Sequence, residues 1–285
     1  MCTGMNTKQL SKGTRRARRN LALKIALEQP FIGELNTYFN KIRKTAINRY
    51  KRNTEFLTSN QFDFGTEAVL TKQYRRVSRA FKDEMRLFLN TEKAIEIKQT
   101  EQELEATVNT ALSVFIPNAV NASSREIDST TTDDISKSFL EASLEITEGG
   151  NALSTNAVST LASLKMAQKF SGRISTIALT ETQNAAEATK IIEAAAMSSK
   201  DDENSPIIDP ATGIAVGTLL IRKTWNAILD QVTRQSHVLA NGQVRPLIEP
   251  FVVQGELLPY PGSSALGASA SNVINCRCSA TYNPI

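Results

Sequence analysis

The residues best suited to chemistry lie near the C-terminal end of this 285-residue chain. They are the only histidine, His237, and two of the three cysteines, Cys276 and Cys278. Side chains two positions apart on an extended strand point to the same face, so both thiols face one side and Arg277 faces the other. One imidazole and two thiolates are ligands that zinc accepts. The sequence therefore predicts a soft-metal site as one use of these residues.

A second interpretation needs no metal. Buried cysteines fill small gaps in a core, and a buried histidine can be satisfied by one hydrogen bond. The Cys-x-Cys spacing is also less specific than the Cys-x-x-Cys pairs of structural zinc sites. Both interpretations stay open at the level of the sequence.

Two charged residues precede the histidine at helical spacing. Asp230 lies seven residues before His237, so a helix would place both on one face and offer the carboxylate as a further ligand. Asp230 and Arg234 are four apart, which favours either an exposed ion pair or a buried polar network that fixes the loop. The candidate structural or metal constellation is therefore Asp230, Arg234, His237, Cys276, Arg277 and Cys278.

The chain lacks the sequence patterns of several common enzyme classes. It contains neither the phosphate-loop spacing nor a dinucleotide-binding glycine pattern, which argues against nucleotide hydrolysis. It has no Gly-x-Ser-x-Gly elbow, and no residue next to Cys276 marks that thiol as an activated nucleophile. We therefore expect a non-enzymatic protein. The alternative is a metal-dependent or transferase-like activity in the C-terminal region.

Charge is distributed unevenly along the chain, although the net charge is only +4. The first 52 residues carry 13 lysines and arginines and only two acidic residues, whereas the remainder carries 20 basic and 27 acidic residues. A basic N-terminal arm is suited to nucleic acid or to an acidic protein surface, and the alternative is a solvated helical face. The candidate contacts to DNA or a partner are Arg15, Arg16, Arg18, Arg19 and Lys24.

Composition is that of an ordinary globular protein, with 41% hydrophobic and 22% charged residues. No apolar run is long enough to cross a bilayer, so we expect no membrane anchor. The N-terminus has no signal-peptide pattern, which predicts a protein kept inside the cell with reduced cysteines.

Apolar periodicity predicts a mostly helical first half. Residues with apolar side chains recur every three or four positions over 32–50 and over 70–88. The polar stretch 117–134, with its Ser-Thr-Thr-Thr run, predicts a break. The remaining helices are predicted at 91–115, 134–147, 155–170 and 174–198.

After residue 206 the composition changes to short aliphatic runs separated by Pro and Gly. These runs predict strands within 213–225, at 251–253 and at 274–282, and a short helix at 232–238 that ends near Asn241-Gly242. The predicted class is α+β, with a mostly helical N-terminal region followed by a small C-terminal module with short strands. The predicted domains are a basic arm at 1–30, a helical assembly region at 31–170 and the C-terminal module at 171–285.

The region from about 174 to 282 contains a series of short motifs. They are Thr180-Glu-Thr-Gln-Asn184, Lys223-Thr-Trp225, Asp230 through His237, Gly242-Gln243, Pro250-Phe251, Pro259-Tyr-Pro-Gly262 and Asn275-Cys-Arg-Cys278. In order and spacing this series resembles the phage Mu protein F-like minor head protein family, also called phage head morphogenesis proteins. Val232 stands where the family often has a second arginine, and no acidic residue lies shortly before Asn275.

The resemblance implies a low-copy minor capsid protein of a tailed bacteriophage, made in the bacterial host cytoplasm and located in the virion head. It implies binding near the portal protein, with packaged double-stranded DNA as a second partner and a role in head assembly or DNA ejection. Major capsid or scaffold protein and a second copy of the chain are further expected partners. No cofactor is expected from the resemblance. The rival interpretations are the enzyme described above and a DNA-binding protein that acts outside the virion.

Overall fold

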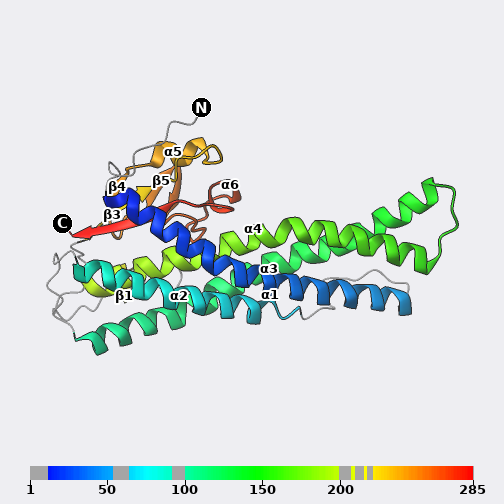
Figure 1. Ribbon diagram of the computed structural model, residues 1–285, viewed down its shortest axis with the longest axis horizontal. Coiled ribbons are helices and arrows are strands. Elements are labelled where there is room, and N and C mark those ends of the chain that lie inside the picture. Colours follow the sequence, from blue (N-terminus) through cyan, green and yellow to red (C-terminus); the bar gives the residue numbers. More distant parts are fainter. Residues whose placement is uncertain are drawn as a thin grey trace. The chain divides into compact units, whose positions relative to one another are not determined.

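The computed structural model describes residues 12–53, 64–91, 100–198, 207–208, 215–216 and 221–284. Four long helices are followed by a small region of short antiparallel strands (Figure 1). The predicted α+β class, with a helical N-terminal region and a C-terminal region of short strands, is confirmed. Within the described ranges, no helix has both the length and the apolar character needed to cross a bilayer.

The four helices are α1 (Lys12–Asn53), α2 (Thr66–Thr91), α3 (Glu101–Glu148) and α4 (Thr155–Ser198). The predicted apolar stripes of the first two are buried, as periodicity requires. On α2, the stripe that includes Leu70 and Phe81 is fully inaccessible to solvent. On α1, Phe39 and Ile42 are similarly buried.

The predicted break at 117–134 is wrong, because α3 runs through it without interruption. The hydroxyls of Thr131 and Thr132 donate to the carbonyls of Ile127 and Asp128, one helical turn earlier. These polar side chains are therefore satisfied inside the helix and do not compete with its backbone bonds. Buried apolar residues such as Ile135 supply the stripe that the sequence pattern obscured.

The helices predicted at 155–170 and 174–198 form the single helix α4. Gly172 lies in its exposed face, so the glycine interrupts the apolar pattern without ending the helix. The neighbouring Arg173 anchors this stretch: its guanidinium donates to Thr131 Oγ1, to Asp134 Oδ2 and to the carbonyl of Ile127.

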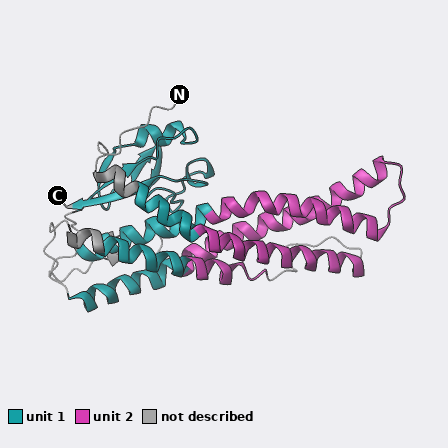
Figure 2. Ribbon diagram, viewed as in Figure 1, with its two compact units in different colours: residues 1–27, 74–116, 179–285 teal, residues 28–73, 117–178 magenta. Residues whose placement is uncertain are grey.

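The chain packs as two compact units (Figure 2). Unit 1 comprises residues 1–27, 74–116 and 179–285, and unit 2 comprises residues 28–73 and 117–178. Each of the four long helices contributes residues to both units. The packing units therefore differ from the predicted domains 1–30, 31–170 and 171–285, which follow chain order.

Unit 2 is a helical bundle held by aromatic contacts. The rings of Phe39 and Phe170 have centroids 4.8 Å apart, and those of Tyr50 and Phe139 are stacked at 4.4 Å. Its α3–α4 connection includes Gly150, two residues after the end of α3, which has a φ of +71°. Because only glycine adopts this conformation without strain, the residue type fixes the end of the helix.

The strands of unit 1 form three small antiparallel sheets. In the largest, β3 (Ile221–Asn226) lies between β4 (Val244–Pro246) and β7 (Ser279–Pro284), and β3 aligns Trp225 with Ala280. The other pairs are β1 (Ile207–Ile208) with β2 (Ala215–Val216), and β5 (Phe251–Val253) with β6 (Glu256–Leu258).

Two short helices complete unit 1, namely α5 (Gln235–Ala240) and α6 (Ala270–Val273). The strand predicted at 251–253 and the helix end at Gly242, where φ is +81°, are confirmed. The last strand was predicted from 274 but begins at Ser279, because a turn follows α6 and includes Asn275 at a φ of +57°.

Two glycines of unit 2 give a matched test of this backbone account. Gly150→Ala should destabilise the protein by about 1 kcal/mol, because alanine is strained at positive φ. Gly172→Ala should stabilise it by about 0.5–1 kcal/mol, because no atom obstructs the added methyl group in an exposed helical position. Urea denaturation measures both changes. Equal effects of the two substitutions would contradict the assigned backbone conformations.

Candidate functional site

The histidine and the two C-terminal cysteines meet in unit 1. His237 Nδ1 lies 3.3 Å from Cys278 Sγ and 3.8 Å from Cys276 Sγ. All three side chains are at most 2% exposed, and neither thiol is in a disulfide. Both sulfur atoms lie near the same imidazole nitrogen, so the thiols share one side, but residues 276–278 precede strand β7 and do not form the predicted strand. A cluster that could bind a metal is therefore present.

Packing on three sides fixes the histidine and the cysteine segment. The imidazole of His237 packs edge-on against Trp225 of β3, with centroids 5.5 Å apart. Ile274 and Asn275, which directly precede Cys276, are also held. Arg234 donates to the carbonyl of Ile274 at 2.5 Å, and the backbone N–H of Asn275 donates to Thr180 Oγ1. These bonds hold the turn that directs the following segment inward. Buried His237 Nε2 has no hydrogen-bond partner among the described residues.

The two thiols differ in their affinity for a proton. Hydrogen bonding from Cys278, together with His237, lowers the pKa of Cys276 to about 5, although burial opposes this shift. The pKa of Cys278 is raised, chiefly because it donates to Cys276 and is buried beside the resulting charge.

Asp230 and Arg234 belong to the same region but not in the predicted way. Helix α5 begins only at Gln235, so Asp230 shares no helical face with His237. Its carboxylate pairs with Arg277 at 2.7 Å and accepts bonds from Thr233 and the Val232 N–H. Asp230 therefore lies outside the His–Cys–Cys cluster. The predicted pair with Arg234 is replaced by the pair with Arg277, because Arg234 donates to a backbone carbonyl.

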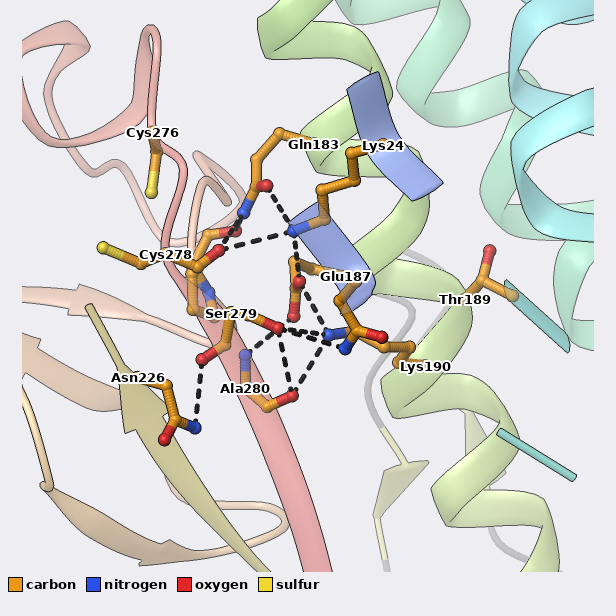
Figure 3. A network of polar contacts seen from close by, with 12 residues as sticks. Lys24, Gln183, Glu187, Thr189, Lys190, Asn226, Cys276, Cys278, Ser279 and Ala280 are labelled. Atoms are coloured by element: carbon orange, nitrogen blue, oxygen red, sulfur yellow. Dashed lines mark hydrogen bonds and ion pairs between the residues drawn. The ribbon is translucent and has the colours of Figure 1, made fainter. Parts of the chain in front are cut away.

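The carbonyl of Cys278 faces a second cluster, a buried ionic network, on the opposite side from its thiol (Figure 3). At the centre of this network, Glu187 Oε1 lies 2.6 Å from Lys24 Nζ and 2.7 Å from Lys190 Nζ. All three side chains are at most 3% exposed. Burial alone would raise the pKa of Glu187, but the two ammonium groups hold it below its ordinary value.

The remaining bonds of the network attach strand β7 to helix α4. Lys190 donates to Ser279 Oγ at 2.8 Å and to the carbonyl of Ala280 at 3.1 Å. Glu187 Oε2 accepts the backbone N–H of Ala280 at 3.0 Å. Lys24 brings the N-terminal helix to the same point through Gln183 Oε1 at 2.6 Å. Helix α1, helix α4 and strand β7, which are distant in sequence, therefore meet at the same buried charged groups.

Lys24 was predicted as a contact to DNA or a partner, and this prediction is wrong. Its ammonium is buried and its hydrogen bonds are directed to groups of unit 1. Of the other predicted contacts, Arg18 and Arg19 are exposed, and Arg19 pairs with Glu84 at 2.9 Å. The side chains of Arg15 and Arg16 lie outside the described part of the structure.

Gln183 is a residue that the sequence analysis quoted but to which it gave no role. Its amide donates to the carbonyls of Pro261 and Cys278, at 2.9 and 2.8 Å. It packs so closely on Gly262 that a Cβ there would lie 2.8 Å from Gln183 Cγ. Its motif neighbour Asn184 accepts a hydrogen bond from Tyr260 at 3.0 Å. The Thr-Glu-Thr-Gln-Asn and Pro-Tyr-Pro-Gly motifs therefore touch.

The charged residues Glu187 and Lys190 were missed altogether. They follow the quoted motif on an alanine-rich helix, at the i, i+3 spacing of an ordinary exposed pair. A weak signal was available: nearly all other residues around them are alanine, isoleucine or threonine, which indicates a buried helix. Charges in such a helix require partners, and the sequence did not identify Lys24 as one.

Comparison with known proteins gives no match: no family model, no curated protein and no solved structure matches this chain. The function must therefore be argued from the residues and their geometry.

One groove of unit 1 is separate from its two buried clusters. A shallow apolar groove lies between α5 and β5, but none of its lining residues is His237 or a cysteine. The groups of the ionic network are saturated by one another, and the His–Cys–Cys cluster is buried. A substrate therefore has no direct access to these groups in the arrangement described. The groove is lined by Gln235, Ser236, Leu239, Ala240, Val252 and Gln254.

Lys223, from the Lys-Thr-Trp motif, is a third buried lysine, after Lys24 and Lys190. It lies on β3, donates to the carbonyl of Pro259 at 2.6 Å and lies over the ring of Phe251. Burial lowers its pKa to about 7, an effect only partly opposed by Glu249. The folded chain therefore retains this positive charge at a cost in stability.

Glu187→Gln should destabilise the protein by about 3–5 kcal/mol, because two ammonium groups would stay buried without a counter-ion. Urea denaturation at neutral pH measures this loss. Glu145→Gln is the matched control, since it removes a carboxylate from the exposed pair with Lys165 and should leave stability nearly unchanged. Equal losses in both variants would show that the buried network does not hold unit 1 together.

Lys223→Met should change the pH dependence of stability. The pKa of Lys223 is about 7 when folded and near 10.5 when unfolded, so the unfolded state binds more protons between these values and wild-type stability rises with pH. Methionine removes this dependence. The stability of the variant relative to wild type should therefore be greatest below pH 7 and decline towards pH 10.5. Denaturation of wild type and variant at a series of pH values tests this prediction. A difference in unfolding free energy between them that does not vary with pH would contradict it. Lys44→Met, at an exposed lysine, is the control.

Proposed function

We propose that this chain is a non-enzymatic minor head protein of a tailed bacteriophage, bound at the portal vertex of the virion head. One observation carries the proposal. The motifs that resemble the Mu F-like family are scattered over 180–278, yet their residues bond to one another within unit 1. A resemblance spread over unrelated surface positions would carry less weight than one concentrated in a single packed module.

The pairings within this module support a shared architecture. Asp230 of the Asp-to-His motif pairs with Arg277 of the Asn-Cys-Arg-Cys motif. His237 of the first motif contacts both cysteines of the second. Gln183 on α4 joins the second motif to the Pro-Tyr-Pro-Gly loop. Each of these motifs thus supplies a contact to another, which supports the proposal that they form one architecture.

An assembly role suits this module better than catalysis. The histidine is 2% exposed, whereas a general acid or base must reach its substrate. The proposed function therefore needs no cofactor for a reaction. Exposed Arg18 and the basic segment before it are suited to packaged double-stranded DNA, and the long helices provide surfaces for the portal protein. Capsid, scaffold and a second copy of the chain are further candidate partners.

Quantitative mass spectrometry of purified virions, from the phage that encodes this chain, tests the proposal. The expected result is a low copy number in DNA-filled particles, far below that of the major capsid protein. Measurement after triggered DNA release then separates two roles: loss from emptied particles supports ejection with DNA, and retention supports a fixed place at the portal vertex. Absence from the virion would overturn the proposal in favour of an enzyme or a free DNA-binding protein.

Variants of the chain define the contribution of the basic arm in the same particles. Replacing Arg15, Arg16, Arg18 and Arg19 with glutamine should lower the number of DNA-filled heads while leaving the folded protein intact. Replacing exposed Lys41, Lys44, Lys51 and Arg52, also on α1, removes the same charge and should have no such effect. Equal effects of the two sets would assign the result to net charge instead of to the arm.

A further inference from the structure

We propose that His237, Cys276 and Cys278 bind a zinc ion. The distances between the donor atoms carry the inference. A tetrahedral zinc with Zn–S bonds of about 2.3 Å and Zn–N bonds of about 2.0–2.1 Å holds its nitrogen and sulfur ligands about 3.5 Å apart. His237 Nδ1 lies 3.3 and 3.8 Å from the two sulfur atoms, and all three ligand atoms lie within 4.8 Å of one another.

Hydrogen bonds from Cys278 and His237 to Cys276 are available without a metal, but they give no role to the close approach of Cys278 Sγ to His237 Nδ1. An imidazole nitrogen carries either one proton or one lone pair, yet two sulfur atoms lie against Nδ1 of His237. Thiols are also weak hydrogen-bond donors and acceptors. A zinc ion at their centre would use the lone pair of the imidazole and both sulfur atoms at once.

The burial of the three side chains is compatible with a bound zinc ion. The three side chains are at most 2% exposed, so a bound ion would be shielded from water. Zinc with two thiolates and a neutral imidazole has no net charge, so the occupied site needs no further counter-ion in this buried position. Thiolate and imidazole are ligands that zinc prefers over the oxygen donors of magnesium or calcium sites.

The zinc would connect helix α5, which carries His237, to the segment that leads into β7. The Asp230–Arg277 pair and the bond from Arg234 to Ile274 already hold these two segments together on either side of the cluster. The three ligand side chains are therefore held near one another by contacts that do not depend on the metal. Three donors leave one vertex of a tetrahedron for a fourth ligand, which spectroscopy of the bound metal would identify.

Metal analysis of the full chain, purified under reducing conditions from zinc-supplied cells, tests the site. Wild type should contain about one zinc per chain. X-ray absorption at the zinc edge should show two sulfur neighbours at about 2.3 Å together with nitrogen. Cobalt substitution should give a thiolate-to-metal charge-transfer band and intense visible bands, as tetrahedral sulfur-containing sites do.

His237→Gln and the double variant Cys276→Ser with Cys278→Ser should each lose at least tenfold of the bound metal. Val273→Ala is the matched control: it removes buried volume from the same segment but no donor atom, and should keep its zinc. If the donor variants fail to fold, the wild-type cobalt spectrum decides alone. Wild type that neither contains nor takes up zinc, or a double-cysteine variant that retains it, would overturn the proposal. Neither result bears on the presence of the protein in virions.

Discussion

The buried carboxylate of Glu187 is the constraint on which the rest of unit 1 depends. Taking this charge and two ammonium groups out of water carries a large desolvation cost, which is offset only while all of them stay in place. Lys24 comes from the N-terminal helix, and the N–H that the carboxylate accepts belongs to Ala280 in the last strand. The network therefore sets where α1, α4 and β7 meet, and hydrophobic packing fills the space around it.

The bonds of Cys278 link the ionic network to the His–Cys–Cys cluster. The carbonyl of Cys278 accepts bonds from Gln183 and Lys24 on one side, and its thiol points away from them (Figure 3). The thiol lies 3.3 Å from Nδ1 of His237, which belongs to α5. The position of the thiols thus follows from the ionic network and from the turn at Asn275. The proposed assembly role would benefit from such a module, because a surface that binds partners keeps its shape only if the core beneath it does.

Much of this arrangement could be predicted from the sequence, where the signal is periodic or chemically distinctive. The stripe through Leu70 and Phe81 predicted α2, and the unique histidine with the Cys-x-Cys pair predicted the cluster. Prediction failed where tertiary contacts override local preference. The threonine run near Thr131 reads as a loop, but its hydroxyls bond within α3. In the sequence, Lys24 resembles the other basic residues of the N-terminal arm. It is buried because it pairs with Glu187, which is distant in sequence.

The division of the chain between the two units has a consequence for synthesis on the ribosome. All residues of unit 2 lie between 28 and 178, so they have all been synthesised before residue 179 is added. Unit 1 combines residues 1–27 with residues after 178, since Lys24 and Ala280 bond to the same carboxylate. Lys24 therefore lacks its counter-ion until Glu187 has been added, and the carboxylate lacks its backbone donor until Ala280 follows. A chain that stops between residues 178 and 279 would carry all of unit 2 and an incomplete unit 1.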